Sequence, residues 1–326
     1  MIYTIKEIEE EEWRELWEKC PKSNLLQSWP YGIAKKNSHN LTPVNFLILG
    51  EGKPIALVQV LLKKLPIFFS VARINRGPVL IGDHELLDRK DIVLNIINLL
   101  ISECRKMKCF LLQIAPELEQ DDNTAKALSN LGLYKLSNPA WSSGLLNLQM
   151  KDEDLLMHLK GKWRNCLRKG HKMGVQVKHT KDNSLDINKV IETYQSLQKD
   201  KNFIGLSESL LRELSNKVQK NWQFNIFRAF IDDSEDHIGI LVTIEHGDTA
   251  IYLIGATNDL GRQHQANYVL LWYAIQFSKN NNCSWFDIGG LNKTTPRGVA
   301  HFKNGLKATP YNLIGEWRKI FFPRIF

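Results

Sequence analysis

The strongest constraint on the fold is an order of elements that occurs twice along the chain. Each copy reads as a hairpin of two strand-like runs, a further strand, a long helix and a buried strand. The first copy has its turn at 50–54 and the later elements at 71–75, 91–106 and 110–114. The second copy has its turn at 232–236 and the later elements at 250–255, 267–279 and 285–288. An offset of 174 residues carries Cys109 onto Cys283, so we infer an internal duplication.

A duplicated chain of 326 residues is long enough for two domains. We expect a mixed α/β (α+β) fold with domains at 1–150 and 151–314. The second domain is predicted to begin with one basic helix from Asp152 to Met173. Asp152 is suited to cap that helix and Gly174 to end it.

Composition narrows the functional class. The five cysteines are scattered without a CxxC pair, so we predict free thiols and no metal site. The acidic start at 7–12 is unlike a signal peptide, and the apolar stretches are shorter than the roughly 20 residues that a membrane span needs. We therefore expect a cytoplasmic protein.

The net charge of +8 is concentrated in one segment. Residues 155–181 contain no acidic residue and eight basic ones: Lys160, Lys162, Arg164, Arg168, Lys169, Lys172, Lys178 and Lys181. Such a run attracts phosphates, RNA or an anionic membrane surface, although a solvated helix face has the same pattern.

Six short motifs in a fixed order resemble those of one family. They are Gln27–Gly32 with Lys35, Arg76–Val79, Trp163–Lys169 with Gly174 and Val175, Trp272–Ile275, Phe286–Gly290, and Phe302–Gly305. Together they resemble the FemABX-like peptidyltransferases, which are tRNA-dependent peptidoglycan bridge aminoacyltransferases. The resemblance implies two tandem GNAT-like acyltransferase units around a cleft, here without a coiled-coil arm. It also implies transfer of an amino acid from aminoacyl-tRNA to a UDP-linked muramyl peptide or lipid II.

The resemblance assigns candidate residues to this reaction. Lys303, with Phe302 beside it, is the catalytic candidate, because a fixed cation stabilises the negative charge that develops on the ester carbonyl. The substrate-binding candidates are Lys35, Trp29, Tyr31, Arg76, Lys201, Tyr252, Tyr268 and Asp287. The candidates for tRNA phosphates are Arg164, Arg168, Lys169 and Lys172.

Direct transfer fits the absence of a nucleophile elbow from the sequence. The residues leave open which base deprotonates the amine, with Asp287, His264 and His301 as candidates. Lys201 stands where the family usually has an arginine, as a point charge without the bidentate fork. We expect no cofactor or metal, with aminoacyl-tRNA as co-substrate.

The expected partners are aminoacyl-tRNA and a peptidoglycan precursor, with no DNA, and the expected state is a monomer. The basic and aromatic tail at 318–326 either contacts the inner membrane face or packs back on the first unit with the rest of 315–326.

Two other functions stay open. One is an acyl-CoA-dependent N-acyltransferase, although residues 262–267 lack the glycines of a diphosphate-binding loop. The other is a non-catalytic RNA-binding or membrane-binding protein.

Overall fold

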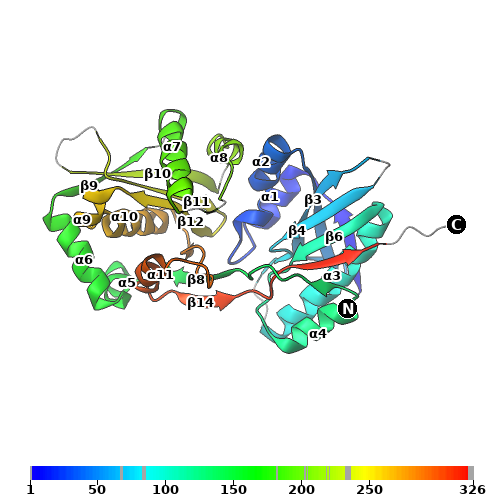
Figure 1. Cartoon of the computed structure of the whole chain (residues 1–326). Helices are drawn as coiled ribbons and strands as arrows, with labels where there is room; N and C mark the ends of the chain where they lie inside the picture. Colours follow the sequence, from blue (N-terminus) through cyan, green and yellow to red (C-terminus); the bar gives the residue numbers. More distant parts are fainter. Residues whose placement is uncertain are drawn as a thin grey trace. The chain divides into compact units, whose positions relative to one another are not determined.

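The computed structural model describes residues 2–66, 69–82, 86–180, 183–201, 203, 205–217, 219, 221–231 and 236–321. The chain forms two compact units (Figure 1). The first comprises Met1–Ser142 with Tyr311–Phe326, and the second comprises Ser143–Pro310. The main segment of the first unit therefore ends somewhat before the predicted boundary at residue 150.

The first unit is built on a sheet with strand order β1-β2-β3-β4-β6-β15-β7, and β5 pairs with β3. Its strands are β1 (Tyr3–Glu7), β2 (Thr42–Gly50), β3 (Lys53–Lys64), β4 (Ser70–Asn75), β5 (Val79–Leu80), β6 (Cys109–Ala115), β7 (Tyr134–Lys135) and β15 (Trp317–Ile320). Helices α3 (Leu86–Lys106) and α4 (Asp122–Asn130) pack on one face, and α1 (Glu10–Trp17) and α2 (Trp29–His39) cover the other (Figure 1). A short 3-10 turn at Leu25–Gln27 precedes α2.

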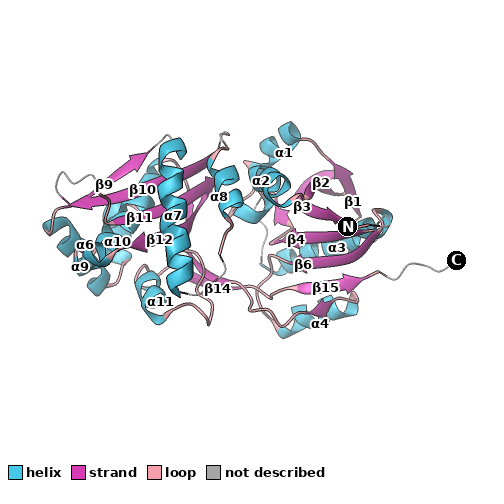
Figure 2. Cartoon of the chain, turned by 45° about the horizontal axis from the view of Figure 1, so that its top comes forward, coloured by secondary structure: helices cyan, strands magenta, loops and turns pink. Residues whose placement is uncertain are grey.

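The second unit is built on a sheet with strand order β14-β8-β13-β12-β11-β10-β9. Its strands are β8 (Ser142–Asn147), β9 (Val175–Thr180), β10 (Trp222–Ile231), β11 (Gly239–His246), β12 (Thr249–Thr257), β13 (Trp285–Asp287) and β14 (Thr309–Asn312). Its helices are α5 (Asp152–His158), α6 (Gly161–Lys172), α7 (Asn183–Lys201), α8 (Glu208–Ser215), α9 (Asp259–Gln263), α10 (Ala266–Asn280) and α11 (Arg297–Asn304). Helix α10 packs on one face of β9–β11, and α7 covers the opposite face (Figures 1 and 2).

The repeated order seen in the sequence is present in both units. In each, three antiparallel strands lead into a long helix and then into a strand that pairs in parallel with the third. These elements are β2–β3–β4, α3 and β6 in the first unit, and β10–β11–β12, α10 and β13 in the second. The mixed α/β fold expected from the sequence is confirmed.

One predicted element is wrong. The single helix expected over 152–173 is two helices, α5 and α6, separated at Leu159 and Lys160. Leu159 is extended (φ −59°, ψ 151°) and fully buried, and Lys160 N donates to Gly305 O at 2.9 Å. Burial of this leucine and a bond to the end of α11 outweigh continuation of the helix.

The described part of the C-terminal tail adds a strand to the first unit. Strand β15 lies between β6 and β7, with Trp317 opposite Ile114 and almost completely buried. Residues 322–326, the rest of the segment for which a membrane contact was considered, lie outside the described residues. Within the described part of the chain, no helix is both long and apolar enough to cross a bilayer.

Candidate functional site

Helix α11 carries Lys303, and an aromatic cluster fixes this helix in the second unit. Phe302 stacks on Trp163 of α6 with ring centroids 6.1 Å apart, and Tyr268 of α10 meets both rings edge-on. Gly305 gives Trp163 room, because a Cβ there would collide with the indole ring. Since neighbouring side chains on a helix point about 100° apart, anchoring Phe302 directs Lys303 away from this cluster.

Lys303 ends in a partly polar enclosure. Its side chain is only 6% exposed, its Nζ donates to Gly290 O at 3.2 Å, and the ammonium lies 4.8 Å from the centre of the Tyr252 ring. Burial lowers the pKa of Lys303 to about 8, although the nearby Asp287 charge works in the opposite direction. The ammonium is thus held away from bulk solvent and titrates near physiological pH.

The Lys303 side chain ends where strands β12 and β13 stop pairing. The parallel ladder of β12 and β13 ends at Ile251 opposite Asp287, after which the chains continue as Tyr252 and as the 288–290 turn. On its other side β12 has a register shift opposite Val242 and Thr243. Such irregularities commonly redirect side chains beside functional sites.

Asp287 holds the turn that presents the Gly290 carbonyl. Its Oδ1 accepts from the Ser143 hydroxyl and from Gly289 N, the latter at 2.9 Å. Gly289 has φ +72°, and a Cβ there would lie 2.7 Å from Tyr252 O and 3.2 Å from Lys303 Nζ. Glycine is therefore required by both backbone conformation and close approach. Nothing in the sequence linked Ser143 to this turn.

The structure gives two predicted site residues packing roles. Phe302, named with Lys303 as catalytic, and Tyr268, named as substrate-binding, both belong to the aromatic cluster. Burial is the main cause that raises the pKa of Tyr268 to about 12, with Cys166 beside it. Their observed contacts position α11.

Lys35 lies on α2 of the first unit. Ser28 caps that helix by accepting from Tyr31 N at 3.4 Å, and Pro30 stands in its first turn. Half-buried Lys35 has a lowered pKa, first through burial and second through the positive charge of Arg73 on β4. Among the described residues, no hydrogen bond or ion pair is formed by Lys35 Nζ. Two neighbouring cations with one of them unpaired form a candidate anion site.

Sequence reasoning missed Arg73 as a partner of Lys35. Its Nη2 pairs with Glu316 Oε1 at 2.6 Å and its Nε donates to Asn75 Oδ1 at 2.7 Å, so the guanidinium is held in place while remaining partly exposed. The sequence did offer one signal for the contact of Arg73 with Asn75. The two residues are two positions apart on one strand, so their side chains lie on the same face.

The other first-unit candidates are engaged within the protein. Trp29 packs 6.0 Å from the Trp13 ring, and Tyr31 is buried, which raises its pKa to about 12. Arg76 forms a two-pronged ion pair with Glu117, both bonds measuring 2.7 Å, and lies over the Tyr311 ring. These contacts lie within the protein, and the substrate-binding roles of these residues stay predictions.

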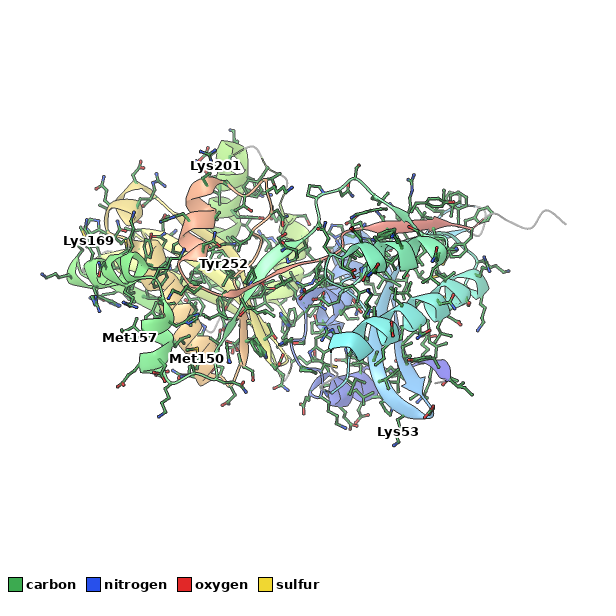
Figure 3. All side chains as sticks on the ribbon, turned by 90° about the horizontal axis from the view of Figure 1, so that it is seen from below. Lys53, Met150, Met157, Lys169, Lys201 and Tyr252 are labelled. Carbon is green, nitrogen blue, oxygen red and sulfur yellow. The ribbon has the colours of Figure 1, made fainter. Side chains whose placement is uncertain are left out.

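The basic residues of α6 divide into two kinds. Arg164 donates to the carbonyls of Met157 and Leu159 at 2.7 and 2.8 Å, so it caps the end of α5. Arg168, Lys169 and Lys172 are exposed at helical spacing, on the side opposite the buried Trp163 and Leu167. Lys201 is exposed at the end of α7, separate from Lys169 on α6 (Figure 3).

The two histidines considered as candidates for the base, His264 and His301, lie near the surface. His264 Nδ1 lies 3.0 Å from Leu260 O, and His301 is exposed on α11. Across the described ranges, no group of three or more His, Cys, Asp or Glu side chains is arranged to hold a metal ion.

Comparisons with known proteins bear on this arrangement. The FemAB family model matches residues 207–324, the segment that carries Tyr252, Asp287 and Lys303. The crystal structure of FemX superposes with a TM-score of 0.79 at 15% identity, covering 98% of this chain and 97% of that one. Residues 207–324 thus match the FemAB family, and the chain has the fold of FemX. The resemblance read from the six motifs is confirmed, as is the tandem GNAT-like fold.

Two other solved structures share the fold of this chain. A tandem GNAT protein from the clavulanic acid biosynthesis pathway has a TM-score of 0.55 at 13% identity, covering 99% of each chain. The C-terminal domain of a putative lysylphosphatidylglycerol synthetase from Agrobacterium fabrum has a TM-score of 0.55 at 10% identity, covering 95% of this chain and 93% of that one. No curated protein matches. These two likenesses show the shared fold, and the FemAB match over residues 207–324 supports a transferase.

Proposed function

We propose that this protein transfers an amino acid from aminoacyl-tRNA to the amine of a peptidoglycan precursor stem peptide. The observation that carries the proposal is the buried Lys303 ammonium, held by Gly290 O and the Tyr252 ring in the segment matched by the FemAB family. An ammonium kept out of water at an energetic cost is a feature that stability alone does not favour.

The chemistry assigned to this site is direct acyl transfer. The incoming neutral amine attacks the ester carbonyl, and negative charge develops on the carbonyl oxygen. The tRNA ribose oxygen then leaves with the bonding electrons and takes up a proton, while the amine nitrogen gives one up. Lys303 in its protonated form stabilises the developing charge in a site of low polarity, where such an interaction is stronger than in water. Both substrates are made inside the cell, so we place the reaction on the cytoplasmic side.

A direct assay tests the proposed function. The purified protein is incubated with a mixture of charged tRNAs and either UDP-linked muramyl peptide or lipid II. Mass spectrometry of the stem peptide then reports any added residue. The expected result is the mass of one amino acid, dependent on charged tRNA. Addition of an acyl group from coenzyme A with no addition from tRNA contradicts the proposal.

Lys35 and Arg73 are proposed to bind the diphosphate of the precursor. Replacing either with Ala should raise KM for the precursor about tenfold with kcat little changed, because charge-assisted hydrogen bonds to a phosphate typically contribute about 1.5–3 kcal/mol. Steady-state kinetics at varied precursor concentration measure this. Lys36→Ala, an exposed neighbour on α2, is the matched control. An unchanged KM in both variants contradicts the assignment.

Arg168, Lys169 and Lys172 are proposed to contact tRNA phosphates. Changing all three to Gln should reduce the slope of log affinity against log salt by about 2–3, since each lost phosphate contact removes about 0.7–0.9 from that slope. Filter binding of tRNA at several salt concentrations gives the slope. Removing three exposed lysines elsewhere (Lys36, Lys53 and Lys126) should leave it nearly unchanged. Equal effects of the two triple variants contradict the assignment.

The coenzyme A alternative is disfavoured by packing at the start of α10, where a diphosphate would bind in this fold. Helix α9 directly precedes α10 in place of an open loop, and α6 packs against α10. A Cβ added to Gly170 of α6 would lie 3.2 Å from His264 O and 3.3 Å from Gln265 O. Carbonyls covered by a helix do not form an anion site.

A further inference from the structure

One end of the first-unit sheet combines exposed aromatic side chains with basic ones. The C-terminal ends of β3 and β15 and the N-terminal ends of β4 and β6 meet there, as the pairs Lys64–Ser70, Ser70–Cys109 and Ile320–Leu111 show. Leu65 N donates to Phe69 O at 2.8 Å, so these two residues lie side by side at this end. We call this end the sheet-end patch; its described residues are Lys63, Lys64, Leu65, Phe69, Arg105, Lys108 and Phe110.

The two phenylalanines of the patch are exposed together. Phe69 is 36% exposed and Phe110 is 40% exposed, and their rings meet edge-on with centroids 6.1 Å apart. Phe110 is the extra residue at the register shift between β4 and β6, where Ser70 pairs with Cys109 and Val71 pairs with Leu111. A bulge of this kind redirects its side chain, so the ring is turned out rather than into the core.

The charged residues in the segments around these rings are all basic. Segments 63–66, 105–110 and 318–321 contain seven Lys or Arg and no Asp or Glu. Lys319 Nζ donates inward to Leu131 O, and Lys106 pairs with Glu103. Lys63, Lys64 and Lys108 are exposed, and Arg105 lies over the Phe321 ring. Cations therefore surround exposed rings without neighbouring carboxylates in these segments.

We propose that the sheet-end patch binds the surface of a bilayer containing anionic lipids, with Phe69 and Phe110 entering the headgroup region. Aromatic rings favour that region, and lysines close to an anionic surface each strengthen binding by about fivefold. An RNA partner is less suited, because Leu65 adds an aliphatic side chain beside the rings, which neither base stacking nor phosphate contacts use. The proposal does not depend on the aminoacyl-transfer reaction.

Vesicle sedimentation of the full chain tests the patch. The protein is mixed, in about 0.1 M salt, with vesicles of phosphatidylcholine alone or with vesicles in which about one lipid in three is phosphatidylglycerol. That proportion of anionic lipid gives a strong negative surface potential. The wild type should bind the anionic vesicles at least about a hundredfold more tightly than the neutral ones. Phe69→Ser with Phe110→Ser should weaken binding about tenfold, and Lys63→Gln with Lys64→Gln and Lys108→Gln about a hundredfold.

Two controls keep the result decisive. Ile2→Ser removes an exposed apolar side chain at the opposite end of the same sheet and should bind like the wild type. The lysine variants change only exposed side chains, so they report on the patch even if the phenylalanine variant unfolds. The proposal is overturned if the wild type does not bind anionic vesicles. It is also overturned if the triple lysine variant binds them as tightly as the wild type, or if that variant loses tRNA binding while it keeps vesicle binding.

Discussion

Replacing Lys303 with Met is expected to lower the rate of aminoacyl transfer by about 10²–10³, while the protein folds at least as stably as the wild type. The rate falls because a preorganised donor to a developing oxyanion typically contributes about 2.7–4 kcal/mol to lowering the barrier. Single-turnover transfer from a charged tRNA measures the rate. Substrate binding should change little, since the interaction strengthens in the transition state.

The stability expected of this variant follows from the pKa of Lys303. The pKa is about 8 in the folded protein and has its ordinary value of 10.5 when unfolded, so the folded state binds fewer protons between these values. The free energy of unfolding of the wild type should therefore rise with pH from about 8 to about 10.5. At neutral pH this pKa difference lowers the free energy of unfolding of the wild type by about 3 kcal/mol, a cost that Met does not carry. Urea unfolding at pH 7 and pH 10 checks both statements.

If Lys303→Met lowers both the transfer rate and the free energy of unfolding, the role of this residue is structural. Lys307→Met, in an exposed residue just after α11, is the matched control and should alter neither quantity. The combination of lost activity with retained or increased stability is what the account requires.

Asp287→Asn is expected to move the alkaline limit of activity to lower pH, by about one unit, without abolishing transfer. Asn keeps an acceptor for Gly289 N and Ser143, so the 288–290 turn is retained. The lost negative charge, however, is the interaction that holds the pKa of Lys303 up against burial. Transfer near pH 6.5 should thus approach the wild-type rate, and transfer above pH 7.5 should fall.

This variant also decides between two roles for Asp287. If the carboxylate is the base that deprotonates the amine, Asn abolishes transfer at every pH. If it positions and tunes Lys303, the pH profile moves. Ser143→Ala removes a hydrogen bond to Asp287 but leaves its charge, so its alkaline limit should stay near that of the wild type.

The sequence predicted most of the architecture, because the repeat and the strand and helix periodicities are local signals. It failed at Leu159 and Lys160, where burial of the leucine and the bond from Lys160 N to Gly305 O break a segment whose composition favours a helix. Lys303 was identified from a motif and Tyr252 as a strand aromatic suited to stacking, yet their mutual contact required the parallel pairing of β12 with β13.

The remaining differences concern partners that are distant along the chain. Ser143 reaches Asp287 across 144 residues, and Arg73 is held by Glu316 across 243. Arg76 and Arg164 carry the charge expected of phosphate ligands, but Glu117 and two backbone carbonyls occupy their guanidinium groups. Residue type alone does not distinguish a cation that awaits a ligand from one already paired.

The pH dependence of single-turnover transfer, compared between the wild type and Lys303→Arg, tests the role of Lys303 most directly. The wild-type rate should fall as the pH rises through about 8, because the pKa of Lys303 lies there and only the protonated form stabilises the oxyanion. Arginine stays charged throughout, so the variant should be slower but should lack this falling limb. A wild-type rate that keeps rising above pH 8, or a falling limb that persists in Lys303→Arg, would contradict the account.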